Sequence, residues 1–170
     1  RYIGDWSSDV CSSDLCQRTS SSTAKSFTSV TERVFFDSNV LLYMLSEDMD
    51  KANRAEVLLA GGGTISVQVL NELTLAGRRK FRLDWDGIDQ FLVPVRGLCE
   101  IKPMTEETYD LGRKLAERYQ LPVYDAMIVA AALLAGADTL YSEDMHDGLL
   151  VEDRLCIRNP FRARSVQDTP

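Results

Sequence analysis

Residues 34–43 read VFFDSNVLLY, and this stretch decides the fold. Three consecutive apolar residues, 34–36, predict a short strand buried on both faces. Asp37 ends that strand, and a helix is expected over residues 40–45, with Tyr43 in the core. A buried strand that leads directly into a helix is typical of a parallel α/β sheet, in which ligands bind beyond the carboxyl ends of the strands.

The same alternation of short apolar runs and longer amphipathic segments continues along the chain. Further strands are expected at residues 64–67, 100–103, 138–141 and 155–157. Further helices are expected at residues 50–60, 69–79, 85–93, 105–119 and 124–135. This order predicts an α/β fold of three layers, α/β/α, around a mainly parallel sheet of four to five strands.

The composition fits one folded domain. The chain has 170 residues, of which 45% are hydrophobic, and no apolar run approaches the roughly 20 residues of a membrane span, so no membrane association is expected. Four cysteines without metal-ligand spacing fit a reducing cytoplasm. The net charge of −7 argues against charge-driven binding to nucleic acid. That objection weakens if several acids converge on a metal ion, because the ion reverses the local field.

The first residues of the chain have a different character. Residues 1–15, RYIGDWSSDVCSSDL, lack periodicity and resemble the translation of a sequencing-adapter oligonucleotide. Residues 16–32 are rich in Ser and Thr and are expected to be disordered or spurious upstream sequence. The folded domain is therefore expected over residues 33–161, with a C-terminal tail at 162–170.

Four acids fall near one edge of the predicted sheet. Asp37 follows the first strand, and Asp144 closely follows the strand at residues 138–141. Glu72 lies in the first turns of the helix after the second strand, and Asp125 lies early in an otherwise apolar helix. Burying Asp125 there is unfavourable unless it is paired or bound to metal, although an acid at a helix N-terminus is also stabilised by the helix dipole.

The chemistry of this acid set suggests a metal site. Mg²⁺ and Mn²⁺ are hard cations that prefer oxygen ligands, and they need no His or Cys ligand. Carboxylates from separate elements can hold such ions against a phosphodiester, where the metal lowers the pKa of a bound water. The hypothesis is therefore metal-dependent cleavage of a nucleic-acid strand.

Four segments carry a resemblance to a known family: VFFDSNVLLY, ISVQVLNEL, YDAMIVAAAL and LYSEDM. In this order and at this spacing they resemble the motifs of the PIN domain, particularly the VapC-type toxins of bacterial toxin–antitoxin pairs. The resemblance implies a Rossmann-like fold and an endoribonuclease that depends on Mg²⁺ or Mn²⁺. It also implies an RNA substrate, a homodimer and a small antitoxin as partner.

Matched residue by residue, the resemblance implies that Asp37, Glu72 and Asp125 are the first three metal-binding and catalytic acids. Asp144 would be the fourth acid, or would act through a water. Which of Asp144 and its acidic neighbours Glu143 and Asp147 faces the metal stays open at this point.

The resemblance also implies two supporting polar residues. Asn39 matches a position that supports the first acid, and Ser142 matches the hydroxyl residue two positions before the last acid.

A basic cluster and a histidine have weaker implications. Arg78, Arg79 and Lys80, with Arg82 nearby, could grip RNA phosphates, or could simply place cations at a helix C-terminus. The single histidine, His146, is expected in an exposed loop.

Three other functions compete with the nuclease hypothesis. An aspartate-based phosphatase would want a second Asp where this chain has Asn39. A receiver domain would want a Lys after a late strand, and residues 138–143 contain none. A non-catalytic PIN-like module that only binds a partner is the third, and the presence of all four acids speaks against it.

Overall fold

The computed structural model describes residues 32–162 of the chain. The adapter-like segment at residues 1–15, all but the last of residues 16–32, and all but the first residue of the expected tail lie outside the described residues. The expectations for those segments therefore stay predictions.

The described residues form one six-stranded sheet with the strand order β3-β2-β1-β4-β6-β5. All neighbouring strands run parallel except the pair β5 and β6 at one edge. The strands are β1 (Val34–Phe36), β2 (Gly63–Ser66), β3 (Cys99–Lys102), β4 (Thr139–Tyr141), β5 (Leu150–Val151) and β6 (Leu155–Arg158). The two-residue strand β5 is the one that the sequence pattern did not indicate.

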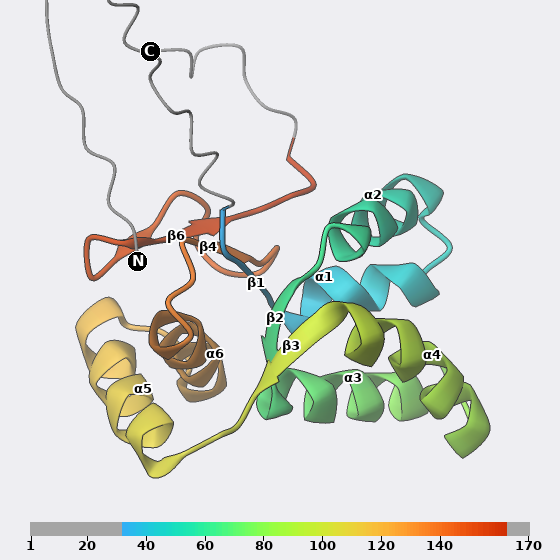
Figure 1. The fold of residues 1–170 in the computed structure, drawn as a ribbon, viewed down its shortest axis with the longest axis horizontal. Helices are drawn as coiled ribbons and strands as arrows, with labels where there is room; N and C mark the ends of the chain where they lie inside the picture. Colours follow the sequence, from blue (N-terminus) through green and yellow to red (C-terminus); the bar gives the residue numbers. More distant parts are fainter. Residues whose placement is uncertain (1–31, 163–170) are drawn as a thin grey trace, which may run out of the picture. The chain divides into compact units, whose positions relative to one another are not determined.

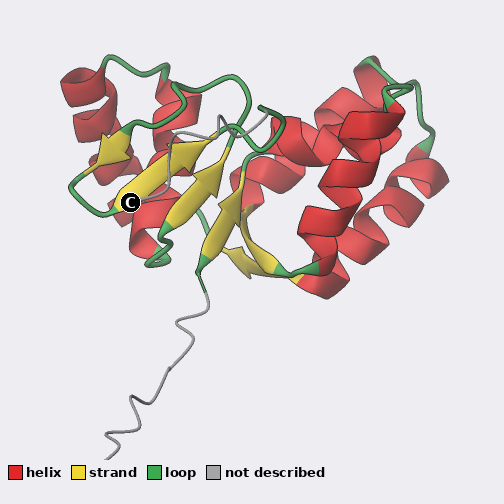
Figure 2. Ribbon diagram, turned by 90° about the horizontal axis from the view of Figure 1, so that it is seen from above, coloured by secondary structure: helices red, strands yellow, loops and turns green. Residues whose placement is uncertain are grey.

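Helices cover both sides of the sheet (Figure 2). They are α1 (Ser38–Leu42), the 3-10 helix η1 (Tyr43–Leu45), α2 (Met49–Ala60), α3 (Val67–Arg79), α4 (Trp85–Leu98), α5 (Glu106–Tyr119) and α6 (Val123–Leu134). Helices α5 and α6 lie together on one side, and α1 to α4 lie on the other (Figure 1). This confirms the three-layer α/β/α architecture and the mainly parallel sheet.

The core forms around β1 and α6. Phe35 and Phe36 are fully buried, and every residue of α6 from 126 to 133 is buried, which explains why this helix is apolar all round. Tyr43 was expected in the core but is only half buried, because its hydroxyl bonds to polar groups outside the core.

The start of α1 differs from the prediction. The helix begins at Ser38 rather than at residue 40, and its N-cap is Asp37, whose carboxylate accepts from the backbone N–H of Ser38 at 2.6 Å. The first candidate acid therefore also satisfies a free backbone donor at the helix start. That contact fixes the carboxylate directly beyond the end of β1.

The strand order explains why the acids gather. Strand β1 lies between β2 and β4, so the order along the sheet reverses at the β1–β4 pair. The backbone N–H of Asp37 donates to the carbonyl of Tyr141 at 2.9 Å, which extends the β1–β4 ladder by one bond. The carboxyl ends of these strands are thus adjacent at a topological switch point, where α/β sheets bind their ligands. Within residues 32–162, no helix is long and apolar enough to cross a membrane.

Candidate active site

Asp37 is the most buried acid of the site, with 5% of its surface exposed. Its Oδ1 accepts from the backbone N–H of Ser38, and its Oδ2 accepts from Asn39 Nδ2 at 2.9 Å and from Ser142 Oγ at 2.7 Å. All of these donors are neutral, and no cation pairs with Asp37 among residues 32–162. A buried carboxylate is thus oriented from both sides while its charge stays uncompensated.

The pKa of Asp37 reflects that environment. Burial raises the pKa from its ordinary value of 3.8 to about 6, against the hydrogen bond from Ser142, which lowers it. The negative charges of Glu72 and Asp125 contribute to this rise as smaller causes. Three acids from β1, α3 and α6 therefore influence one another electrostatically.

Glu72 lies half buried on α3 and reaches toward Asp37. Its Oε2 is 2.5 Å from the hydroxyl of Ser38, which in turn lies 3.3 Å from Asp37 Oδ1. Its Oε1 accepts from Gln68 Nε2 at 2.8 Å. Sequence reasoning missed Gln68 as a positioning contact, although its place one turn before Glu72 on the same helix was a usable signal.

Asp125 lies half buried in the first turn of α6. Burial raises its pKa, and the charges of Glu72 and Asp144 raise it further. No salt bridge of the described residues includes Asp125. The expectation that the carboxylate at this position is partly buried is confirmed.

The structure separates Asp144 from the two acids that compete with it. Glu143 Oε1 accepts from Lys51 Nζ at 2.6 Å, and Asp147 Oδ2 lies 3.3 Å from Arg162 Nη1. Asp144 is exposed, and across residues 32–162 it has no hydrogen bond or ion pair. Of the three, only Asp144 has a carboxylate that is free to turn toward the other acids.

Asn39 and Ser142 tie the end of β1 to the loop after β4. Asn39 Nδ2 also donates to Ser142 Oγ at 3.2 Å, and Asn39 Oδ1 accepts from the backbone N–H of Glu143 at 3.2 Å. Ser142 Oγ accepts from the backbone N–H of Met145 at 3.3 Å. These contacts fix the loop that carries Asp144 relative to Asp37.

Sequence reasoning did not assign Lys51 or Tyr43 to this network. Lys51 on α2 contacts Glu143 and also lies 2.8 Å from the hydroxyl of Tyr43, which donates to Glu143 Oε2 at 2.5 Å. The Lys51 ammonium also lies over the ring of Phe161, 5.4 Å from its centroid. We call Lys51, Tyr43 and Glu143 the Lys51 cluster.

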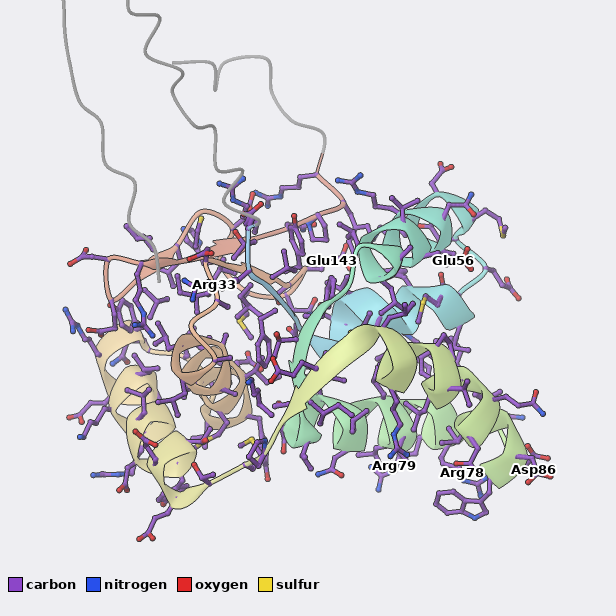
Figure 3. All side chains as sticks on the ribbon, in the orientation of Figure 1. Arg33, Glu56, Arg78, Arg79, Asp86 and Glu143 are labelled. Carbon is purple, nitrogen blue, oxygen red and sulfur yellow. The ribbon has the colours of Figure 1, made fainter. Side chains whose placement is uncertain are left out.

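The basic residues at the end of α3, Arg78, Arg79 and the C-cap residue Lys80, divide into two groups. The guanidinium of Arg78 donates to the carbonyl of Leu83 at 2.6 Å and stacks on Trp85, with 4.9 Å to the ring centroid. Figure 3 shows Arg78 and Arg79 at the outer edge of α3, away from Glu143. Lys80 is different, because it lines a cavity next to Asp144.

That cavity has a volume of about 240 Å³ and lies between η1, the end of α3 and the loop after β4. It is lined by Asn39, Leu42, Tyr43, Ser46, Lys80, Phe81, Glu143 and Asp144. We call it the Lys80 cavity. A larger hollow of about 510 Å³ at α5 and the end of α6 contains none of the four candidate acids.

The four acids suit a hard divalent cation by the chemistry of their donors. All ligands would be carboxylate oxygens, and none of the four is paired with a cation among residues 32–162. As the side chains stand, no group of three or more His, Cys, Asp or Glu residues in this range is arranged to hold an ion. Bringing the carboxylates onto one ion therefore requires side-chain rotation, for which the exposed Asp144 is free.

The fold and the position of the acids define an α/β domain with an anionic site at its switch point. The sequence profile of the PIN domain family matches residues 34–146, which include all four candidate acids. The chain belongs to the PIN domain family. No curated protein sequence matches the chain.

Several solved structures have the same fold. The toxin–antitoxin complex from Klebsiella pneumoniae has a TM-score of 0.58 at 20% identity, covering 76% of this chain and 99% of that one. A sarcin-ricin loop cleaving VapC toxin of Mycobacterium tuberculosis has a TM-score of 0.55 at 16% identity, covering 65% and 89%. The FitAcB structure from Neisseria gonorrhoeae has a TM-score of 0.54 at 17% identity, covering 76% and 99%.

Proposed function

We propose that this PIN domain is a metal-dependent endoribonuclease and the toxin of a toxin–antitoxin pair. The observation that carries the catalytic part is Asp37, a buried carboxylate at the end of β1 that pairs with no cation among residues 32–162, with Glu72 and Asp125 close enough to raise its pKa. Keeping several like charges together in a folded protein is unfavourable, and a bound cation removes the penalty.

In this proposal Asp37, Glu72, Asp125 and Asp144 hold Mg²⁺ or Mn²⁺. When bound, the ion would supply a nucleophilic water at neutral pH and would neutralise charge on the phosphate oxygens. The protein contributes orientation, because the hydrogen bonds to both oxygens of Asp37 hold that carboxylate in one position.

The choice of RNA and of an antitoxin partner rests on similarity. One similar structure is described as a sarcin-ricin loop cleaving toxin and another as a toxin–antitoxin complex. We extend RNA cleavage and an antitoxin partner to this chain, and we add a homodimer as the working form, which the resemblance to VapC-type toxins implies.

The catalytic proposal is tested with the purified full chain. Structured and unstructured RNAs are incubated with Mg²⁺, with Mn²⁺ or with EDTA, and the products are separated on a denaturing gel. Cleavage is expected with either metal, none with EDTA, and a loss of roughly 100-fold or more in Asp125→Asn. Asp110→Asn, which removes an exposed acid on α5, is the matched control and should cleave normally.

Two results would defeat the catalytic proposal: metal-independent cleavage, or equal cleavage by Asp125→Asn and wild type. RNA binding without cleavage would instead support the non-catalytic module. The toxin assignment has its own test, in which the chain is expressed together with the product of the gene beside its own. A stable complex that suppresses cleavage is expected, and a neighbour that neither binds nor inhibits would contradict the assignment.

A further inference from the structure

We propose that the Lys80 cavity is a subsite for one unpaired nucleotide of the RNA strand, adjacent to the bond that is cut. This inference rests on the proposed nuclease function and adds a requirement to it, namely that the substrate must be single-stranded at this position. Three features of the cavity support it: its position, its aromatic and cationic lining, and a buried hydroxyl without a partner.

The position of the cavity links it to the acids. Asp144 and Asn39 line it, and Asn39 also donates to the carboxylate of Asp37. A strand whose phosphate lies at the acids therefore has its neighbouring nucleotide at the cavity. The volume of about 240 Å³ is below the roughly 300–1,000 Å³ typical of pockets for drug-sized ligands, which suits a single base rather than a larger group.

The lining has the chemistry that a nucleotide requires. Tyr43 and Phe81 supply aromatic rings, and base–aromatic stacking accepts any base. Tyr43 is held in place by edge contact with Phe161, at 4.8 Å between centroids, and by the bond of its hydroxyl to Glu143. Lys80 supplies one exposed cation, with its ammonium 5.5 Å from the centre of the Phe81 ring. This cation can contact a phosphate without neutralising the acids.

A hydroxyl at the cavity has no hydrogen-bond partner within residues 32–162. Ser46 lines the cavity, and its Oγ is a buried side-chain oxygen without a hydrogen bond among the described residues. Buried polar groups in proteins normally have a partner. The edge of a base in the cavity offers both the donors and the acceptors that this hydroxyl lacks. A single-stranded base presents that edge, whereas a paired base does not.

The test measures binding, so that it does not depend on turnover. A labelled single-stranded RNA of about ten nucleotides is titrated with the Asp125→Asn protein in Mg²⁺, and the fluorescence anisotropy gives the Kd. Adding Phe81→Leu is expected to raise the Kd by roughly 5- to 150-fold, the range that corresponds to loss of one base–aromatic stack. Adding Lys80→Gln is expected to raise it by a smaller factor that shrinks at high salt.

Matched controls separate the subsite from general effects. Tyr109→Leu removes an exposed aromatic ring on α5, and Arg96→Gln removes an exposed cation on α4, and both residues lie outside the cavity. Neither should change the Kd by more than about twofold. An RNA with one abasic nucleotide next to the cleavage site should bind the Asp125→Asn protein more weakly than the intact RNA does. Once Phe81→Leu is added to that protein, the abasic RNA and the intact RNA should bind with the same Kd.

Two outcomes would overturn the subsite. One is an equal Kd for Phe81→Leu and Tyr109→Leu in proteins with unchanged thermal unfolding. The other is an equal Kd of the abasic RNA and the intact RNA for the Asp125→Asn protein. If wild type cleaves RNA but Phe81→Leu leaves the Kd unchanged, the nuclease proposal stands and the subsite proposal fails. If binding depends on Phe81 but nothing is cleaved, the nuclease fails.

Discussion

At the scale of single residues, the buried carboxylate of Asp37 makes the metal-free protein sensitive to pH. Its pKa of about 6 exceeds the ordinary 3.8 of the unfolded chain. Between those values the unfolded chain ionises while the folded protein keeps its proton. The folded state therefore binds more protons, and its stability falls as the pH rises. The difference between the two pKa values corresponds to about 3 kcal/mol in the free energy of unfolding. This contribution is lost once the pH is well above the pKa of the folded state.

The measurement is urea unfolding of the metal-free protein between pH 4 and pH 7, for wild type and Asp37→Asn. The free energy of unfolding of wild type should fall relative to the variant by roughly 2 to 2.5 kcal/mol across this window, because part of the total is already lost at pH 4. Parallel curves for the two proteins would show that Asp37 does not keep its proton on folding.

The sequence located some site residues and left others undecided for a physical reason. Asp37 could be placed because the end of a buried strand is visible in the local pattern. Asp144 could not be separated from Glu143 and Asp147, because the distinction depends on which acid has a cation. The cation of Glu143 is Lys51, which lies 92 positions away in the sequence. No local pattern contains that pairing.

At the scale of elements, the Lys51 cluster joins α2 to the loop after β4. Changing Lys51→Met leaves Glu143 without its cation in a half-buried place and loosens the loop that carries Asp144. We expect cleavage to fall about 10-fold and the Mg²⁺ concentration for half-maximal activity to rise, as is typical when a group that orients a metal ligand is lost.

The measurement is the cleavage rate as a function of Mg²⁺ concentration. Lys51→Arg should recover much of the rate because it keeps the charge. The matched control is Lys102→Met, which breaks the 2.5 Å pair with Glu100 on β3, outside this network. If Lys51→Met and Lys102→Met have the same Mg²⁺ dependence, the cluster does not position the loop.

The close approach of β2 to β1 requires a glycine. A Cβ on Gly63 would lie 2.4 Å from Cε2 of Phe36, whose ring is fully buried, and 3.2 Å from the carbonyl of Val34. Gly63→Ala is therefore expected to lower the free energy of unfolding by about 1–3 kcal/mol. A Cβ on Gly97 of α4 would meet no heavy atom of another part of residues 32–162 within 4 Å, so Gly97→Ala should instead raise the free energy of unfolding by about 0.4–1 kcal/mol. Urea unfolding of both variants decides the sign, and a stabilising Gly63→Ala would contradict this packing.

The element boundaries show where tertiary packing overrides local signals. The helix predicted to end at residue 93 continues through Pro94 to Leu98 as α4. Pro94 removes one helical hydrogen bond, but the next residue, Val95, is fully buried in the core. Strand β5 was missed because two residues have no periodicity, and it forms only by pairing with β6. Both features depend on contacts that a sequence window does not contain.

At the scale of the whole molecule, the net charge of −7 and the acidic site have one consequence in common. Burial raises the pKa values of Asp37 and Asp125, and the negative charges of neighbouring acids raise them as well: Glu72 and Asp125 act on Asp37, and Glu72 and Asp144 act on Asp125. An ion that binds the folded protein and not the unfolded chain stabilises the fold by mass action. We therefore expect the protein to be marginal without metal and to become more stable with it.

The experiment is thermal and urea unfolding of the full chain with increasing MgCl₂, at an ionic strength held constant with NaCl. At a free Mg²⁺ concentration 100 times the Kd, the free energy of unfolding should rise by about 2.7 kcal/mol. Asp125→Asn should start more stable than wild type in EDTA, since it removes one repelling charge, and should gain less from Mg²⁺. NaCl alone screens exposed charges and does not replace a ligand, so it should not reproduce the effect. An equal gain for wild type and Asp125→Asn would place the ion elsewhere in the molecule and contradict the four-carboxylate site.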